Sequence, residues 1–252
     1  MKKEKKKYKA LILDVDGTLI PNKRDGMPSK KVTHAIAKAS KILHISVATS
    51  RPYFALSHIT KHLGLSGFSI INGGSQIIDI ASQKIIWEQI LNQDDVHQIY
   101  SIAKKLDISF ILQDNVSNLE PSRKNLAKKI SKFWFHALTS PEVNKLKKHI
   151  SHIPTVTVHT LPSWKNDKID LVITHAAATK QHAIIHIAKL LNINTQEIIA
   201  VGDAYVDFPL LMACGLKVAM GNAVDDLKAI ADYVAPSVEE DGVADVIEKF
   251  IL

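Results

Sequence analysis

The chain is poor in cysteine, in aromatic residues and in long apolar runs. Cys214 is the only cysteine among the 252 residues, which excludes an intramolecular disulfide and a metal cluster held by several cysteines. Aromatic residues make up 6% of the chain, and they do not alternate with Arg and Lys as in proteins that bind single-stranded nucleic acid. No apolar stretch reaches the roughly 18 to 20 residues that span a membrane. We therefore expect a cytoplasmic protein with no membrane span and no nucleic-acid partner.

Positive charge is concentrated at the N-terminus. The formal net charge is +7, and residues 1–9 hold six lysines and one glutamate. Such a run predicts a basic, disordered tail, and binding of RNA or anionic lipid by this tail is the alternative. The start of the chain is similar to a signal peptide, but Asp14 interrupts the apolar stretch after four residues. We therefore expect no export.

From Tyr8 onward, short apolar runs rich in β-branched residues alternate with helical patterns. This alternation is typical of βαβ units and predicts an α/β fold with a Rossmann-like, mostly parallel sheet as its core. The first strand, residues 9–15, is nearly all apolar, as expected for a strand buried on both faces. Further strands are predicted at 45–49, 68–72, 197–203, 216–221 and 233–235, and helices at 29–43, after Pro52, and at 178–191, 206–213, 225–231 and 242–251.

The pattern changes between the two halves of this core. Residues 76–90 predict a β-hairpin, because two alternating apolar runs flank a polar turn at 81–84. We predict an inserted α+β domain at 82–172, which splits the core into residues 10–81 and 173–252. Its helices are expected at 94–106, 121–136 and 141–150, and its strands at 108–114, 155–160 and 168–173.

The polar residues that follow the predicted core strands are mostly acidic. Ligands of open α/β sheets bind beyond the carboxyl ends of the strands. Carboxylates about 5 Å apart repel each other by roughly 3 kcal/mol per pair at an effective dielectric constant of about 20. A cation must offset this repulsion unless the carboxyl groups take up protons, and oxygen ligands favour Mg²⁺. The candidates are Asp14 and Asp16 after the first strand, Thr49 and Ser50 after the second, Asn72 after the third, and Asp203 and Asp207 after the strand at 197–203.

Four motifs follow one another along the chain. They are DVDGTL at 14–19, a hydrophobic strand ending at Thr49, Lys180 in a helix, and GDAYVD at 202–207. In this order they resemble the motifs of the haloacid dehalogenase (HAD) superfamily. The long insertion between the second and third motifs is similar to the type IIB cap domain of the Cof-type phosphatases. ATSRP at 48–52, NGG at 72–74 and MGNA at 220–223 also resemble signatures of that subfamily.

The resemblance implies a Mg²⁺-dependent phosphatase that hydrolyses a small phosphorylated metabolite, such as a sugar phosphate, through an aspartyl-phosphate. It makes Asp14 the nucleophile and Asp16 the general acid and base. It implies that the cap closes over the core to exclude water and select the leaving group, and we expect a monomer or a weak homodimer. The implied metal ligands are Asp14, Asp203, Asp207 and the backbone carbonyl of Asp16; Thr49 and Lys180 would complete the phosphate site, and Ser50, Arg51, Asn72 and Asn222 would contact the substrate.

Two departures from the family pattern bear on activity. Val206 stands where the family usually has Asn, and Gln181 stands where Gly is frequent. Two alternatives therefore stay open. One is a phosphomutase of the same superfamily, and the other is a catalytically weak binding protein that uses its basic tail. His182 and His186 lie one helical turn apart and could share a metal, but the chain has no HExxH motif.

Overall fold

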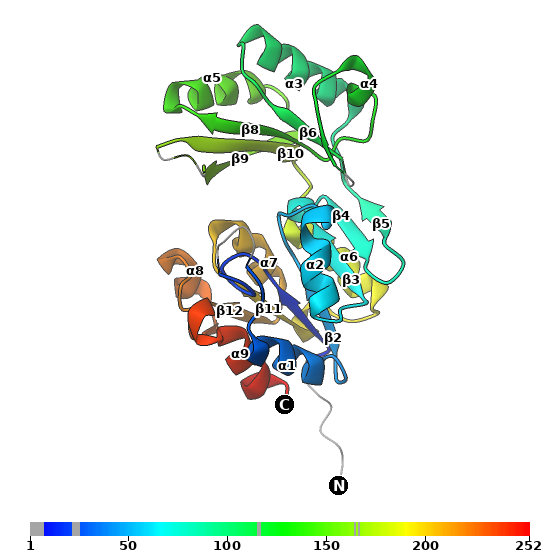
Figure 1. Ribbon diagram of the computed structural model, residues 1–252, viewed down its shortest axis with the longest axis vertical. Coiled ribbons are helices and arrows are strands. Elements are labelled where there is room, and N and C mark those ends of the chain that lie inside the picture. Colours follow the sequence, from blue (N-terminus) through cyan, green and yellow to red (C-terminus); the bar gives the residue numbers. More distant parts are fainter. Residues whose placement is uncertain (1–7, 22–25, 115–116, 164, 166) are drawn as a thin grey trace. The chain divides into compact units, whose positions relative to one another are not determined.

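The computed structural model describes residues 8–21, 26–114, 117–163, 165 and 167–252. Residues 1–7 of the predicted basic tail lie outside the described residues. Lys9, the last residue of the predicted tail, forms an ion pair with Glu197 at 2.7 Å. The chain divides into two compact units (Figure 1). The core unit comprises Met1–Arg51, Ala55–Trp87 and Thr179–Leu252, and the insert unit comprises Glu88–Ala178 together with Pro52–Phe54.

A five-stranded parallel sheet forms the centre of the core unit. Its order is β13-β12-β11-β1-β2. All four residues of β1 are completely buried, as the continuous apolar run predicts. Leu13, the last residue of β1, lies beside Val201 in β11 and Val47 in β2, so the chain leaves these three neighbouring strands at the same edge of the sheet. The strands are β1 (Ala10–Leu13), β2 (His44–Val47), β11 (Ile198–Gly202), β12 (Leu216–Ala219) and β13 (Tyr233–Val234).

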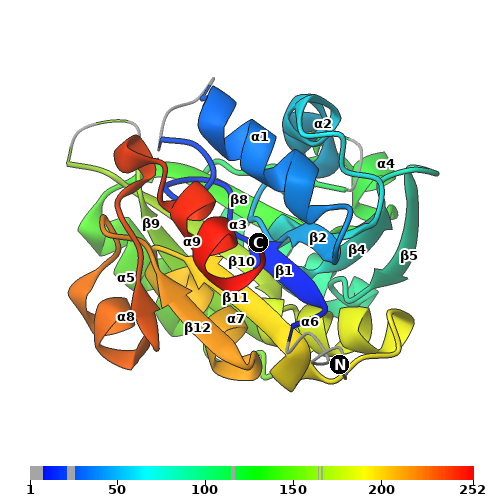
Figure 2. The ribbon, with the colours of Figure 1, turned by 90° about the horizontal axis from the view of Figure 1, so that it is seen from below.

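Helices cover both faces of this sheet. Helices α1 (Lys30–Ala39) and α9 (Gly242–Phe250) lie on one face, and α6 (Lys180–Leu190) and α7 (Phe208–Ala213) lie on the other (Figure 2). The hydroxyl of Ser29 caps α1 by accepting the amide of Val32 at 3.1 Å. The buried residues of α1 recur at the spacing of one helix face. Helices α2 (Tyr53–His62) and α8 (Asp225–Ile230) complete the unit.

The strand predicted at 68–72 does not join the parallel sheet but belongs to a separate small sheet. Strand β3 (Phe68–Ile71) pairs antiparallel with β4 (Gln76–Asp79), and β5 (Lys84–Glu88) completes this small sheet. One parallel bridge, between Ala48 and Ile70, connects β3 with the chain after β2. Because β5 pairs within the core unit, the division between the units falls after Trp87 rather than at residue 82.

The insert unit is an antiparallel sheet covered by helices on one face. Its order is β7-β6-β8-β10-β9. Helices α3 (Gln93–Lys105), α4 (Arg123–Leu126) and α5 (Ser140–Ile150) lie on one side of this sheet (Figure 1). The strands are β6 (Ile111–Gln113), β7 (Asn118–Leu119), β8 (Lys132–Leu138), β9 (Val156–Pro162) and β10 (Ile169–His175). The second division falls after Ala178 rather than at residue 172, because β10 pairs with β8 and β9 along its whole length.

The predicted helix at 121–136 is wrong. Only Arg123–Leu126 is helical, and Lys132–Leu138 is the strand β8. Phe133 and Phe135 alternate toward the helix-covered core of the insert unit, and both lie within 5.5 Å of the Phe110 ring, measured between ring centroids. Packing of alternate aromatic residues has outweighed the helical propensity of the lysine-rich stretch before them.

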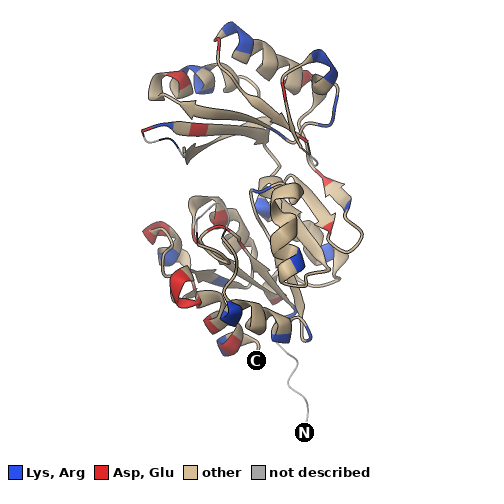
Figure 3. Cartoon of the chain, in the orientation of Figure 1, with Lys and Arg blue, Asp and Glu red and all other residues tan. Residues whose placement is uncertain are grey.

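The strands of both units carry few charged residues (Figure 3). A group of buried charges at one edge of a sheet is therefore an exception in this molecule. None of the helices in the described residues has the length and apolar character that a membrane crossing requires.

Candidate active site

Three buried or half-buried carboxylates meet at the carboxyl edge of the core sheet. Asp14 follows β1, and its amide donates to the Val201 carbonyl of β11 at 3.0 Å. Asp203 follows β11, and Asp207 ends a short 3₁₀ turn, Tyr205–Asp207. Each of the three offers an oxygen that lies within 4.8 Å of the others. The structure thus brings together three of the predicted metal ligands.

Lys180 joins two of these carboxylates. It is the first residue of α6, whose N-terminus is capped by the hydroxyl of Thr179. Its ammonium donates to Oδ1 of Asp14 and to Oδ1 of Asp207, at 2.6 Å in each case. Burial alone would lower the pKa of Lys180, but Asp14 and Asp207 outweigh it and raise this pKa. The lysine is therefore a permanent cation inside the cluster.

Glycines allow the cluster to form at these distances. A Cβ at Gly17, whose φ is +86°, would lie 2.2 Å from Oδ2 of Asp203. A Cβ at Gly74, with φ +104°, would lie 2.2 Å from the carbonyl carbon of Thr179, just before Lys180. Only glycine combines this backbone conformation with so close an approach. The Asp-Gly turn and the NGG loop therefore set the positions of Asp203 and Lys180.

Asp203 and Asp207 have different hydrogen-bond partners. Thr18 donates its hydroxyl to Oδ1 of Asp203 at 2.8 Å. The second oxygen of Asp207 accepts the amides of Asp203 and Ala204, each at 3.0 Å. Asp207 thus holds the turn that carries Asp203, in addition to its contact with Lys180. Sequence reasoning missed Thr18, although its place in the DVDGT motif could have indicated it.

The charges in this cluster do not balance. Burial raises the pKa of Asp14 well above its usual range, and Asp207 adds to this effect while Lys180 opposes it. Burial also raises the pKa of Asp203, to about 6. Three carboxylates and one ammonium leave two negative charges without compensation when all are ionised. A divalent cation with oxygen ligands fits this donor set.

Arg51 is bound to Asp16. Its Nε donates to Oδ2 of Asp16 at 2.9 Å and its Nη2 to Oδ1 at 2.6 Å, which is a two-pronged ion pair. The Asp16 side chain is one-third exposed and that of Arg51 less so. Asp16 was predicted as the general acid and Arg51 as a substrate contact, and no sequence pattern indicated that they bind each other.

Thr49 and Ser50 lie where β2 leaves the sheet. The hydroxyl of Thr49 accepts the amide of Arg51 at 3.1 Å, and its carbonyl accepts the amide of Gly73 at 2.9 Å. Ser50 is exposed, and its hydroxyl lies 4.0 Å from the place that a Cβ on Gly73 would take. Thr49 therefore links the second motif to the NGG loop.

Asn72 and Asn222, both predicted to contact the substrate, have different hydrogen-bond partners in the structure. Asn72 is buried with a positive φ of 52°. Its side-chain nitrogen donates to Gln76 at 2.8 Å, while its side-chain oxygen has no hydrogen-bond partner among the described residues. Asn222 donates to the Gly17 carbonyl and accepts the amide of Val238, each at 2.8 Å. Asn222, which follows β12 at the same edge of the sheet, therefore fixes the turn after Asp16.

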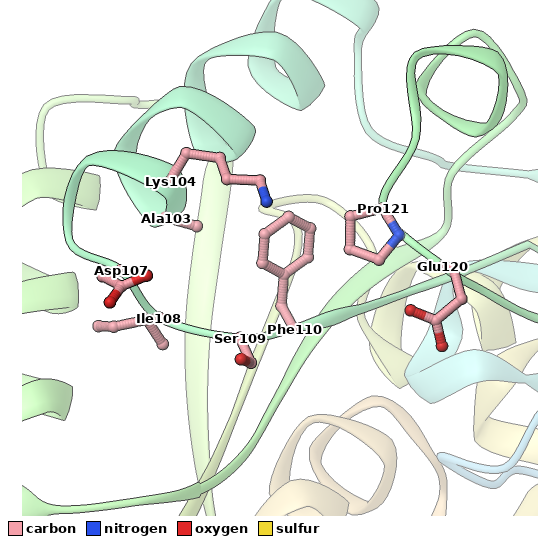
Figure 4. A pocket seen from close by; sticks show the side chains of 8 residues that line it. All are labelled: Ala103, Lys104, Asp107, Ile108, Ser109, Phe110, Glu120 and Pro121. Atoms are coloured by element: carbon pink, nitrogen blue, oxygen red, sulfur yellow. The ribbon is translucent and has the colours of Figure 1, made fainter.

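A pocket of about 300 Å³ lies in the insert unit, and none of the predicted site residues lines it. Its walls come from the end of α3 and from the chain before β6 and after β7, with Lys104, Phe110 and Glu120 around the opening (Figure 4). It is separate from the acidic cluster, which belongs wholly to the core unit.

Comparison with known proteins identifies the family. The profile of the haloacid dehalogenase-like hydrolases matches residues 11–247. The chain belongs to this family. The HAD hydrolase is 26% identical over 259 residues to 5-amino-6-(5-phospho-D-ribitylamino)uracil phosphatase YcsE of Bacillus subtilis, covering 97% of this chain and 96% of the relative. It is 25% identical over 248 residues to phosphoglycolate phosphatase of Methanobrevibacter smithii, covering 96% and 98% of the two chains.

Solved structures share its fold. A haloacid dehalogenase-like hydrolase from Bacteroides thetaiotaomicron superposes with a TM-score of 0.82 at 21% identity, covering 96% of this chain and 99% of that one. The HAD subclass IIB sugar phosphatase BT4131 superposes with a TM-score of 0.79 at 23% identity, covering 96% and 98%. The predicted α/β fold and the resemblance to Cof-type phosphatases are confirmed. The family match makes this chain a hydrolase, and the two curated relatives quoted above are phosphatases by name.

Proposed function

We propose that this enzyme hydrolyses small phosphate monoesters with Mg²⁺, through a phosphoryl group carried on Asp14. The observation that supports this most is the Lys180 ammonium held between Asp14 and Asp207, beside Asp203. The lysine occupies one oxygen of Asp14, which leaves Oδ2 as the nucleophile. The match to the hydrolase family over residues 11–247 and the names of the curated relatives support the reaction class.

The proposed reaction has two displacements at phosphorus. In the first, Oδ2 of Asp14 forms a bond to phosphorus while the bond to the alcohol oxygen breaks, and Asp16 gives its proton to that oxygen. In the second, Asp16 takes a proton from water, the water oxygen bonds to phosphorus, and the Asp14 carboxylate leaves. Splitting the hydrolysis in this way lowers the barrier of each step, and inorganic phosphate is the product.

The side chains around Asp14 support these steps by their charge and position. Lys180 opposes the rise that burial causes in the pKa of Asp14, and it offers a positive charge to the phosphoryl oxygens. Thr49 would donate its hydroxyl hydrogen to the same group, because its oxygen already accepts the Arg51 amide. A Mg²⁺ ion bound by Asp14, Asp203, Asp207 and the Asp16 carbonyl would supply further positive charge.

Arg51 has two uses that exclude each other. Its two-pronged bond to Asp16 favours the ionised carboxylate. Asp16 must hold a proton when it acts as an acid, so we propose that Arg51 turns to the substrate phosphate when substrate binds. Ser50, Asn72 and Asn222 would shape the surrounding loops. We further propose that the insert unit is a cap that selects the leaving group, and that the enzyme works in the cytoplasm.

A phosphatase assay tests this proposal. The wild type, Asp14→Asn and Asp225→Asn are compared for phosphate release from an aryl phosphate and from sugar phosphates, with Mg²⁺ and with EDTA. Asp225 is a matched control because its carboxylate is fully exposed. We expect activity that needs both Mg²⁺ and Asp14 and that survives in the control. Turnover by Asp14→Asn, or turnover unchanged by EDTA, would refute the mechanism. Activation by a bisphosphorylated sugar, with slow hydrolysis, would favour the phosphomutase instead.

A further inference from the structure

Strand β5 is an open edge of the small sheet. The order of this sheet is β3-β4-β5, and among the described residues no further strand joins the outer side of β5 (Figure 1). The backbone N–H and C=O groups on such an edge can pair with another strand. Natural edge strands usually prevent this pairing with a charge or a proline inside the strand, a bulge, or a covering segment. The sequence of β5, KIIWE at 84–88, has its two charges only at the ends.

The middle of β5 is apolar and held in place. The ring of Trp87 packs on the ring of His186 in α6, with 4.5 Å between the ring centroids. Helix α6 therefore supports one face of the strand. Ile86 projects to the opposite face, because successive side chains of a strand alternate, and it is 41% exposed. A β-branched residue in the middle of an open edge favours pairing with a further strand.

The charges of β5 are complementary to those of a second copy of the same strand. When two β5 strands pair antiparallel about a two-fold axis at Ile86, Lys84 of each copy lies opposite Glu88 of the other. Ile85 then lies opposite Trp87, and Ile86 lies opposite its own equivalent. Directly opposed residues project from the same face with Cβ atoms about 4.5 to 5.5 Å apart, where opposite charges attract and apolar side chains pack.

Other registers lose this match. Moving the axis to Ile85 puts Lys84 opposite Ile86, and moving it to Trp87 puts Ile86 opposite Glu88. Lys84 is exposed and has no hydrogen-bond or ion-pair partner among the described residues. Glu88 already pairs with Lys129, whose side chain is 74% exposed. A carboxylate has about four acceptor sites, so Glu88 can bind a second ammonium without losing the first.

We propose that two copies of this chain form a homodimer by antiparallel pairing of their β5 strands about Ile86. The pairing joins the two small sheets into one continuous sheet. A two-fold dimer uses the same patch on both copies, so one self-complementary strand is sufficient to specify the contact. Lys84 and Glu88 set the register, and Ile86 supplies the apolar centre. The interface lies outside the acidic cluster and does not rest on the proposed reaction.

Sedimentation and hydrogen exchange test the dimer on the full-length chain. Sedimentation velocity over a concentration series that extends to about 1 mM should show a shift from monomer to dimer. Hydrogen exchange, followed by mass spectrometry on the same samples, locates the contact. The peptide that covers residues 84–88 should exchange more slowly at high concentration than at low concentration. The peptide that covers β9, the edge strand of the insert sheet, should exchange equally at both.

A substitution at the axis tests the position of the interface. Ile86→Lys places two ammonium groups face to face and should make the protein monomeric. The fold should survive, because Ile86 is already exposed. Thr160→Lys is the matched control, since it places the same charge at an exposed position of the other open edge, β9. It should leave the dimer intact.

Two charge variants test the register. Lys84→Glu brings like charges together in both ion pairs of the dimer, and so does Glu88→Lys, so each variant alone should raise the Kd of the dimer about 10- to 100-fold. Mixing the two variants restores opposite charges in both pairs, and the mixture should form a heterodimer. A wild type that is monomeric throughout the series, a dimer that persists in Ile86→Lys, or a mixture that associates no better than its components would overturn the inference.

Discussion

Asp203 gives a quantitative test of the charge imbalance in the acidic cluster. Burial raises the pKa of its carboxyl from 3.8 to about 6 in the folded, metal-free protein, and Asp207 contributes, while the hydrogen bond from Thr18 opposes the shift. The perturbation is Asp203→Asn, which removes the charge. The Asn oxygen can still accept the Thr18 hydroxyl.

The sign of the effect follows from the direction of the shift. A carboxyl group whose pKa is higher in the folded state than in the unfolded state stabilises the fold fully below its unfolded pKa, and this stabilisation is lost as the pH rises through the folded pKa. A shift of about 2 pKa units corresponds to at most about 3 kcal/mol, and solvent screening at this partly exposed group reduces it to about 1 to 2 kcal/mol. The wild type should lose this amount relative to Asp203→Asn between about pH 4 and pH 7.

The assay is urea unfolding in EDTA at several pH values for the wild type, Asp203→Asn and the exposed control Asp225→Asn. Subtracting the free energy of unfolding of Asp203→Asn from that of the wild type cancels the contribution of the histidines, because both proteins contain the same histidines. Adding Mg²⁺ near neutral pH should restore the wild type and do much less for Asp203→Asn. Parallel pH profiles for these two proteins, or a wild type that gains stability over Asp203→Asn as the pH rises, would refute the reasoning.

Three further outcomes follow from the geometry of the site. Lys180→Met leaves Asp14 and Asp207 without their shared cation, so it should lower the free energy of unfolding by about 3 to 5 kcal/mol at neutral pH. A loss below about 1 kcal/mol, measured by urea unfolding, would contradict the buried ion pairs. Gly74→Ala should lower the melting temperature far more than Gly64→Ala, because both have a positive φ but a Cβ at Gly64 meets nothing within 4 Å; equal shifts in calorimetry would contradict the close approach. Arg51→Lys keeps the charge but loses the two-pronged contact with Asp16, so kcat should fall by about 10- to 100-fold; steady-state kinetics with an unchanged kcat would show that the guanidinium geometry is not used.

Much of the core unit is predictable from local pattern. A short apolar run such as Ala10–Leu13, followed by an Asp-Gly turn, favours a buried strand. The parallel register then places the residues that follow β1, β2 and β11 at one edge. The meeting of Asp14 and Asp203 is therefore implied by topology alone. The insert unit was harder, because the lysine-rich residues before Phe133 fit a helix and only packing against Phe110 decides for a strand.

The contacts that sequence could not supply are those between distant turns. Arg51 lies 35 residues from Asp16, and Asn222 lies 205 residues from Gly17. No periodicity or local propensity links such positions, and the bonds appear only when the strand ends are assembled.

The central claim is that Asp14 carries the phosphoryl group, and trapping that group tests it most directly. Enzyme in excess over substrate is mixed with Mg²⁺, quenched in acid within one turnover, digested with trypsin and analysed by mass spectrometry. The account predicts that the peptide of residues 10–23 transiently gains the mass of one phosphoryl group, which disappears as phosphate is released, and that Asp14→Asn never gains it. Phosphate release through a full turnover with this peptide unmodified, together with turnover by Asp14→Asn, would contradict the account.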